Sequence, residues 1–189
     1  MFTLKNKYFL IIENTKDIDL SNIKISNKFI IIYRNQKEIK NTDKLMQFRR
    51  ICKCKKIDFY VANNVKLAKI LKSDGLYISA YNKKLNLNNL KNYNFKIIGS
   101  AHNTKELNIK HLQGCSSIIF SRLFKTSYKF KTSFLGIIRF NLFKLSRKEC
   151  LIPLGGINLS NLNKLKLVKS NGFAFMSAIK RERMLNRLF

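Results

Sequence analysis

Eight short apolar segments recur along the chain, and they limit its possible folds more than any other property of the sequence. Each is rich in β-branched and aromatic residues, and longer segments with helical spacing separate them. Most are apolar at successive positions, which is typical of parallel strands covered on both faces. Strand–helix alternation sustained over eight units closes most naturally as a barrel, so we expect a (β/α)₈ TIM barrel. The expected strands are Tyr8–Glu13, Phe29–Tyr33, Asp58–Val61, Leu76–Ser79, Lys96–Ser100, Ser117–Phe120, Leu151–Leu154 and Gly172–Met176.

Four helix candidates lie between the expected strands, and each follows a polar residue able to cap it. Apolar residues spaced three or four apart would turn one face of each helix toward the sheet. Two other crossovers, Asn14–Lys28 and Tyr81–Asn94, look short or irregular. The helix candidates are a segment capped by Thr42 with Leu45, Phe48 and Ile51 on one face, the segment from Asn64 to Leu71, Asn103–Leu112 with a capping box through Glu106, and Asn158–Val168 with Leu159, Leu162, Leu165 and Val168 on one face.

The size and composition of the chain fit one compact domain over residues 1–189. Single domains commonly contain about 100–200 residues, and a hydrophobic fraction of 46% with 15 Phe argues against disorder. No apolar run approaches the roughly 20 residues that cross a bilayer. The N-terminus shows no small-residue cleavage site of a signal peptide. We therefore expect a soluble, cytoplasmic protein with no membrane partner.

The formal net charge of +28 first suggests a nucleic-acid partner. The lysines, however, are spread almost evenly from Lys5 to Lys180 and do not gather in one stripe. Charge spread in this way is more typical of a solvated surface than of a surface that reads nucleic acid. Nucleic-acid binding is therefore less favoured than binding of a small ligand.

The cysteines and histidines give only a weak metal signal. Zinc sites usually combine two close cysteine pairs, or a cysteine pair with histidines at set spacing. This chain has one C-x-C pair and two histidines, His102 and His111. We interpret Cys52, Cys54, Cys115 and Cys150 as reduced, non-structural thiols.

Two turns near the end of the chain are typical of a phosphate site. In the segment Ile152–Asn158, a buried strand leads into Gly155 and Gly156 and then into a capped helix. Glycines leave the backbone N–H groups accessible to a phosphate, and the helix start adds a positive dipole. A second strand-to-helix turn follows at Ala174–Ile179. The loops after strands seven and eight of such barrels commonly bind phosphate, so we expect a phosphorylated ligand there.

The same region resembles the end of the thiamine phosphate synthase/TenI superfamily. Ile152–Asn158 is similar to the family motif IPV-x-AIGGIN, and Gly172–Ile179 is similar to GA-x-GVAV-x-SAI. Three further blocks match in order and spacing over nearly the whole chain. These are Ser73–Ile78, similar to ADGVHLGQ; Ile97–Asn103, similar to IIG-x-SAHN; and Leu123–Lys129, similar to IFPTPTK.

The resemblance implies one (β/α)₈ barrel domain that acts in thiamine biosynthesis. Thiamine phosphate synthases join hydroxymethylpyrimidine diphosphate to thiazole phosphate and release pyrophosphate with the help of Mg²⁺. Lys129 would be a catalytic cation that stabilises the leaving pyrophosphate. By position, Gly155, Gly156, Met176 and Ser177 would hold the thiazole phosphate, Thr126, Ser127 and Tyr128 would line the thiazole pocket, and Lys129 and Ser100 would contact the pyrimidine substrate or its diphosphate.

Departures from the family pattern fall on the metal and diphosphate residues. Of the Q-x-R-E-K motif near strand two, only the arginine remains, as Arg34, a candidate substrate-binding residue. The two family aspartates that bind Mg²⁺ fall on Asn63 and Asn82. Mg²⁺ prefers carboxylate oxygens, and two neutral amides would hold it poorly.

Three functions follow as alternatives. The first is a divergent thiamine phosphate synthase. The second is a TenI-like thiazole tautomerase or salvage protein that binds only thiazole phosphate, in which His102 would be the catalytic residue and no metal would be required. The third is a non-catalytic protein that binds a phosphorylated ligand or nucleic acid.

Overall fold

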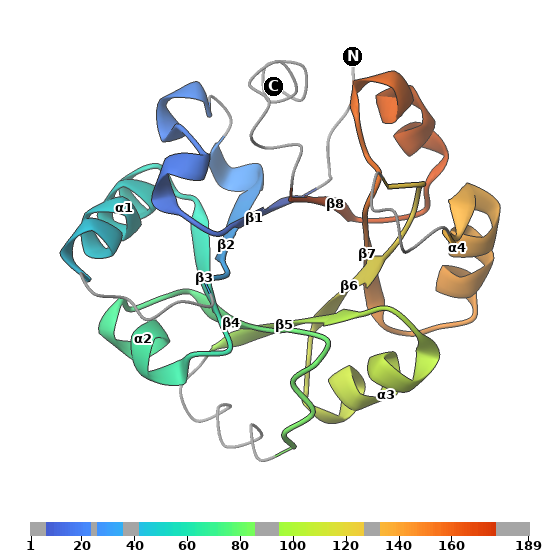
Figure 1. Cartoon of the computed structure of the whole chain (residues 1–189), viewed down its shortest axis with the longest axis horizontal. Helices are drawn as coiled ribbons and strands as arrows, with labels where there is room; N and C mark the ends of the chain where they lie inside the picture. The colour runs from blue at the N-terminus through green and yellow to red at the C-terminus, as the bar shows by residue number, and fades with distance from the viewer. Residues whose placement is uncertain (1–6, 24–25, 36–41, 86–94, 127–132, 177–189) are drawn as a thin grey trace.

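Eight parallel strands form a closed barrel in which each strand pairs with the next and β8 pairs with β1 (Figure 1). The computed structural model describes residues 7–23, 26–35, 42–85, 95–126 and 133–176. The predicted TIM barrel is confirmed, and each predicted strand agrees with an observed one to within one residue at either end. The strands are β1 (Lys7–Ile12), β2 (Phe29–Tyr33), β3 (Asp58–Ala62), β4 (Gly75–Ile78), β5 (Lys96–Ala101), β6 (Ser117–Ser121), β7 (Cys150–Leu154) and β8 (Gly172–Phe175).

Helices surround the barrel in chain order (Figure 1). They are α1 (Asp43–Cys54), α2 (Val65–Ile70), α3 (Thr104–Leu112), α4 (Gly136–Leu145) and the 3₁₀ helix η5 (Leu159–Leu167). Three predicted caps are confirmed. The side chains of Asn64 and Asn103 accept hydrogen bonds from the N–H groups of Leu67 and Glu106, both at 2.9 Å, and that of Asn158 accepts from the Ser160 N–H at 3.0 Å. The Glu106 carboxylate accepts from the N–H of His102 at 2.7 Å, so the other half of the expected capping box is shifted by one residue.

Several crossovers differ from the sequence prediction. Thr42 makes no side-chain cap, and Ile51 is 47% exposed, whereas its neighbour Cys52 is fully buried. The segment after Asn158 is a 3₁₀ helix rather than an α-helix. It begins with a capping box, in which the Asn158 side chain accepts from the Ser160 N–H and the Asn161 side chain accepts from the Asn158 N–H. The first crossover agrees with the irregular segment that the sequence predicted: it contains three short 3₁₀ turns, η1 (Thr15–Asp17), η2 (Leu20–Asn22) and η3 (Ser26–Lys28).

Helix α4 was not expected from the sequence. It has no side-chain cap at Leu135, and its apolar residues lie on all sides. Phe140 is fully buried, while Ile138 and Leu142 are 76% and 61% exposed. A helix without a cap or a polar face gives no clear periodic signal.

The core consists of two layers that the alternating side chains of the strands create. One layer lies between the barrel and its helices. The other fills the inside of the barrel, so the barrel has a packed interior and no open channel through its described residues. The interior layer contains Phe9, Ile11, Ile30, Ile32, Tyr60, Ala62, Tyr77, Ile98, Ile119, Ile152 and Ala174.

The family-like block at the start of β4 stabilises the end of the barrel opposite the strands' carboxyl ends. The Asp74 carboxylate pairs with Arg49 at 2.9 Å and accepts a hydrogen bond from the Phe59 N–H at 2.7 Å. A Cβ atom added at Gly75 would lie 2.1 Å from Cε1 of Tyr60 and 2.3 Å from the backbone oxygen of Lys96. These residues therefore fix β4 between β3 and β5.

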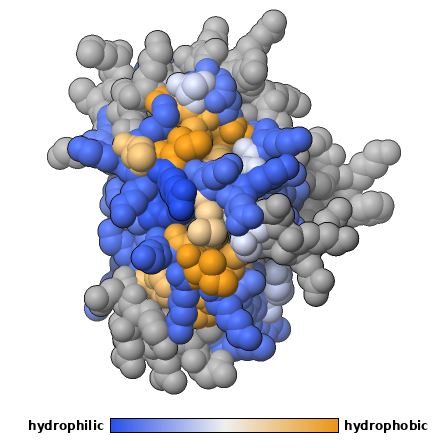
Figure 2. All heavy atoms as spheres, turned by 90° about the vertical axis from the view of Figure 1, so that its left-hand side faces the viewer, coloured by the Kyte–Doolittle hydropathy of each residue, from blue (hydrophilic) through white to orange (hydrophobic). Residues whose placement is uncertain are grey.

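The face that carries α1 and α2 is mainly hydrophilic, with orange apolar areas between the charged and polar side chains (Figure 2). Ile51 and Ile70 are the exposed large hydrophobic residues of these two helices. Among the described residues, no helix is long and apolar enough to cross a membrane.

Candidate functional site

The carboxyl ends of the eight strands open at one end of the barrel, and the described candidate residues lie there. The sequence predicted this clustering because most of the motifs follow strands, and the carboxyl ends of parallel barrel strands lie together. Ser127, Tyr128, Lys129 and Ser177 lie outside the described residues. The described candidates are Arg34 after β2, Asn63 after β3, Asn82 beyond β4, Ser100 in β5, His102 after β5, Thr126 beyond β6, Gly155 and Gly156 after β7, and Met176 after β8.

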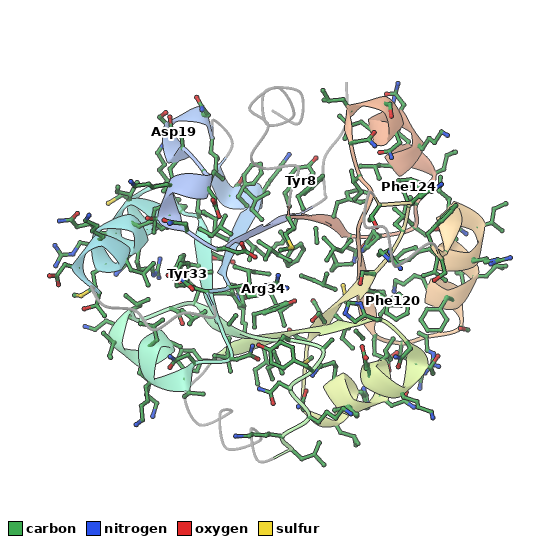
Figure 3. All side chains as sticks on the ribbon, in the orientation of Figure 1. Tyr8, Asp19, Tyr33, Arg34, Phe120 and Phe124 are labelled. Atoms are coloured by element: carbon green, nitrogen blue, oxygen red, sulfur yellow. The ribbon has the colours of Figure 1, made fainter. Side chains whose placement is uncertain are left out.

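Arg34 reaches toward the centre of the barrel (Figure 3). Its Nη2 atom lies 3.5 Å from Sδ of Met176 and 3.7 Å from the carboxylate of Glu13. Its Nε atom is buried and donates to no described residue. The structure thus brings two predicted residues, from β2 and β8, into contact across the opening.

The buried Tyr77 side chain interacts with two of the predicted residues, Arg34 and Ser100. Burial raises the pKa of Tyr77, while hydrogen bonds with the side chains of Ser100 and Arg34 act in the opposite direction. Arg34 and Ser100 therefore meet at one buried phenol, and Tyr77 is a member of the site that the sequence did not single out.

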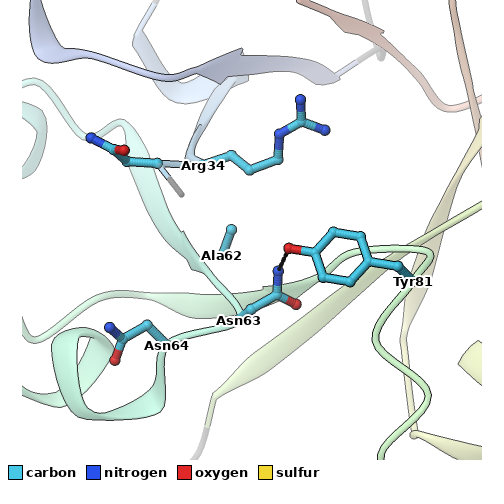
Figure 4. Close-up of a pocket in the computed structure, with 6 residues that line it drawn as sticks. Arg34, Ala62, Asn63, Asn64 and Tyr81 are labelled. Carbon is cyan, nitrogen blue, oxygen red and sulfur yellow. Dashed lines mark hydrogen bonds between the residues drawn. The ribbon is translucent and has the colours of Figure 1, made fainter. Parts of the chain in front are cut away.

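Asn63 and Asn82, which the family resemblance places at metal-ligand positions, are in direct contact. The Asn82 side-chain amide donates to Oδ1 of Asn63 at 3.2 Å. The Asn63 amide in turn donates to the Ser79 hydroxyl at 2.6 Å. It also donates to the Tyr81 hydroxyl at 3.0 Å (Figure 4). We call these four residues the amide cluster.

The amide cluster does not fit Mg²⁺. Oδ1 of Asn63 already accepts two hydrogen bonds, from Asn82 and from the Ser79 N–H at 3.1 Å, and Oδ1 of Asn82 accepts from the Lys84 N–H at 3.2 Å. Mg²⁺ needs oxygen atoms with lone pairs directed at it and is usually held by carboxylates. Within the described part of the chain, no group of three or more His, Cys, Asp or Glu residues could hold a metal ion.

Two buried polar side chains of the α3 region, Lys110 and Gln113, hydrogen-bond the backbone of the segment that carries Asn82. Lys110 donates through Nζ to the backbone oxygen of Asn82 at 2.6 Å and to the side chain of Gln113 at 2.8 Å. Gln113 donates to the backbone oxygens of Asn82 at 3.0 Å and Lys84 at 2.8 Å. Both side chains are fully buried, and burial lowers the pKa of Lys110. No sequence motif indicated this support.

A pocket of about 460 Å³ lies next to the amide cluster, between the ends of β2 and β3 (Figure 4). Among its described lining residues, Arg34 alone carries a full charge, and the other polar side chains are amides and a phenol. It could receive a polar or anionic group. The lining residues are Arg34, Asn35, Ala62, Asn63, Asn64 and Tyr81.

His102 meets Ser121 at the ends of β5 and β6. Nδ1 of His102 lies 2.5 Å from Oγ of Ser121, and the imidazole is exposed. A hydrogen bond at this distance orients the imidazole ring of His102. Ser121 was missed because it stands outside every matched block.

The glycine turn after β7 lies against the loop that follows β6. Gly155 and Gly156 have φ angles of +104° and +68°, a region that favours glycine. A Cβ atom at Gly156 would lie 2.4 Å from the backbone oxygen of Lys125. The Phe124 N–H donates to the backbone oxygen of Gly155 at 3.0 Å. The glycines thus allow the loop that leads to Thr126 to pack directly on the turn.

Comparison with known proteins gives the same family as the sequence motifs. The family model described as thiamine monophosphate synthase matches residues 19–179. The thiamine-phosphate synthase of Clostridioides difficile is 29% identical over 72% of this chain and 65% of the relative, and that of Prochlorococcus marinus is 29% identical over 68% and 38%. The match therefore spans less than two thirds of these two relatives. The thiamine-phosphate synthase of Pelagibacter ubique is 28% identical over 85% of this chain and 80% of the relative.

The fold has a matching solved structure. The thiamine phosphate pyrophosphorylase from Pyrococcus furiosus superposes with a TM-score of 0.73, covering 97% of this chain and 95% of that chain at 16% identity. This likeness concerns the fold alone. The family match over most of the sequence carries the assignment, and this chain belongs to the thiamine monophosphate synthase family.

Proposed function

We propose that this chain binds a thiazole phosphate at the carboxyl end of its barrel and acts in thiamine biosynthesis. The supporting observation is the glycine turn after β7, on which the loop carrying Thr126 packs directly. Met176, Arg34 and Ser100 lie at the same end of the barrel. The phosphate would bind against the turn, with Ser177 beyond β8 as a further ligand, and the thiazole would lie toward Thr126.

The reaction that the geometry favours is an isomerisation of the thiazole phosphate carboxylate, as in TenI-like tautomerases. Such a reaction moves one proton within the ligand and consumes no second substrate. His102 would take the proton from one position of the thiazole and return it at another. Ser121, at 2.5 Å from Nδ1, would hold the imidazole in place. No step requires a metal ion, in agreement with the hydrogen-bonded amide cluster.

Coupling to a pyrimidine diphosphate is the second candidate reaction, because the curated relatives named above are thiamine-phosphate synthases. Here the thiazole nitrogen would bond to the pyrimidine methylene carbon as pyrophosphate leaves. Lys129 and Ser100 would contact the pyrimidine substrate or its diphosphate. The amide cluster in place of the family's metal ligands argues against the family route to this product.

Calorimetric titration with thiazole phosphate tests binding of the ligand that both candidate reactions require. We expect wild-type protein to bind and Ser177→Glu, which adds a negative charge at the expected phosphate position, to lose binding. Asn171→Glu is the matched control, because Asn171 is exposed at the opposite end of β8. Absence of binding by the wild type would reject the proposal.

Two activity assays separate the reactions. Tautomerisation that persists unchanged in His102→Ala would reject the isomerase mechanism. Pyrophosphate release on addition of hydroxymethylpyrimidine diphosphate, present with Mg²⁺ and lost with a chelator, would establish the synthase reaction instead.

A further inference from the structure

Arg122 lies between two residues that the sequence assigned to the ligand site. Its Nη1 atom donates to Oγ1 of Thr126 at 3.1 Å. Its stem lies over Gly155, since a Cβ atom added there would be 2.9 Å from Cγ and 3.1 Å from Cβ of Arg122. The guanidinium of Arg122 thus contacts Thr126, a candidate residue of the thiazole pocket, and its aliphatic chain contacts the glycine turn after β7.

The backbone around Arg122 is fixed from both sides. The Leu135 N–H donates to the backbone oxygen of Arg122 at 3.0 Å, and the Leu123 N–H donates to the backbone oxygen of Leu154 at 2.9 Å. These bonds attach the segment to the start of α4 and to the end of β7. The guanidinium therefore extends from an anchored position, unlike the many lysines spread over the surface.

We propose that Arg122 is the cation that binds the ligand's phosphate at the glycine turn, an inference that rests on the proposed function. A guanidinium carries five N–H donors in a planar fork that matches phosphate oxygens, and charge-assisted bonds of this kind are strong. The bond to Thr126 holds one edge of the fork in place. Glycine at position 155 then has a second role, because any side chain there would displace the arginine stem.

Arg122 also gives the site a positive charge that the recognised motifs do not contain. It stands one residue before the block Leu123–Lys129 and outside every other matched block. With the metal-ligand positions occupied by Asn63 and Asn82, a fixed arginine supplies part of the positive charge that a doubly charged phosphate requires.

The experiment compares Arg122→Met and Arg122→Lys with wild-type protein by calorimetry, using thiazole phosphate, the unphosphorylated thiazole alcohol and inorganic phosphate as three separate probes. Arg147→Met is the matched control, because Arg147 is also half-buried but lies over the Phe143 ring near the amino end of β7. Circular dichroism and the melting temperature confirm that each variant is folded, and Arg122→Lys keeps the charge if the methionine variant is unstable.

We expect Arg122→Met to weaken thiazole phosphate binding roughly 10- to 100-fold, as for loss of a hydrogen bond to a charged group. The affinity of Arg122→Lys for thiazole phosphate should lie between those of wild type and Arg122→Met, and that of Arg147→Met should equal the wild-type value. The affinity of every variant for the thiazole alcohol should not change. Equal affinity of Arg122→Met and wild type for thiazole phosphate would overturn the inference and leave the proposed function intact. If wild type binds inorganic phosphate through Arg122 but not thiazole phosphate, the inference stands and the proposed function fails. Failure to bind any of the phosphate probes would overturn both.

Discussion

Gly75 illustrates how a single residue can be fixed by packing rather than by chemistry. A methyl group there would overlap the Tyr60 ring and the backbone oxygen of Lys96, at 2.1 and 2.3 Å. We expect Gly75→Ala to lower the free energy of unfolding by about 3 kcal/mol, the upper end of the usual cost of overpacking. Gly136→Ala is the control, because a Cβ atom at Gly136 would meet no atom within 4 Å. Only the backbone φ of +71° disfavours alanine there, at a cost of about 1 kcal/mol. Urea denaturation measures both, and a larger loss for Gly136→Ala would contradict the packing argument.

The cysteines should differ sharply in reactivity. Burial raises the pKa of Cys52 and of Cys115 to about 12, whereas Cys54 is exposed. At pH 8 a thiol with such a pKa is ionised in only about one molecule in ten thousand, and the thiolate is the reactive form. We therefore expect a thiol reagent to modify the exposed Cys54 fastest, the half-buried Cys115 slowly and the fully buried Cys52 only on unfolding. Cys54→Ser should remove the fast phase, whereas Cys115→Ser should retain it; fast labelling of Cys115 in folded protein would be inconsistent with its burial.

At the scale of elements, Lys110 connects α3 to the loop after β4. Lys110→Met would remove the bonds to Asn82 and Gln113 and leave the Gln113 oxygen without this donor. We expect a loss of about 1–3 kcal/mol in the free energy of unfolding, as for a buried polar group that loses its partner. Lys105→Met, exposed on the same helix, should have little effect. Urea denaturation at neutral pH provides the comparison.

The effect of Lys110→Met on the free energy of unfolding should depend on pH in a direction that the Lys110 pKa sets. The pKa of Lys110 is lower in the folded protein than its ordinary value of 10.5. Between the two values the unfolded chain binds the proton and the folded chain does not, so stability rises with pH. The difference in unfolding free energy between wild type and Lys110→Met should therefore increase as the pH approaches 10.5. A difference that decreases over this range would mean that burial does not oppose the charge.

The strands could be predicted from the sequence more accurately than the helices, for a physical reason. A strand buried on both faces is a continuous run of residues such as Ile30, Ile31 and Ile32, and polar residues mark its ends. Helix α4 lacks both a cap and a polar face, so its sequence carries neither of the two signals that mark a helix. Segment η5 has a capping box and apolar residues three apart, a pattern that does not distinguish a 3₁₀ helix from an α-helix.

The candidate residues that the sequence predicted lie in motifs at or beyond the carboxyl ends of the strands. Arg34, Asn63 and His102 are of this kind, and their positions in the barrel follow from the strand order. Ser121, Arg122 and Lys110 could not be predicted, because each acquires its role through a neighbouring unit. Ser121 meets the histidine after β5, Arg122 meets the turn after β7, and Lys110 supports the loop after β4.

At the scale of the whole molecule, the formal charge of +28 comes from 38 lysines and arginines against 10 acidic residues. Three ion pairs join described residues to one another, and one of them includes a histidine. Repulsion between like charges should therefore outweigh attraction and destabilise the folded chain. Screening acts over a Debye length of about 30 Å at 0.01 M salt and about 8 Å at 0.15 M. We expect the melting temperature to rise as KCl increases across this range.

An uncharged solute at matched osmolality is the control for this salt effect, because it leaves the charges unscreened. A melting temperature that falls with KCl would mean that ion pairs, rather than repulsion, dominate the electrostatic energy. Potassium phosphate at the same ionic strength extends the test, since screening alone gives equal shifts for the two salts. Any additional stabilisation by phosphate that disappears in Arg122→Met reflects binding of the anion to the folded state, because a ligand that binds only that state raises its stability by mass action.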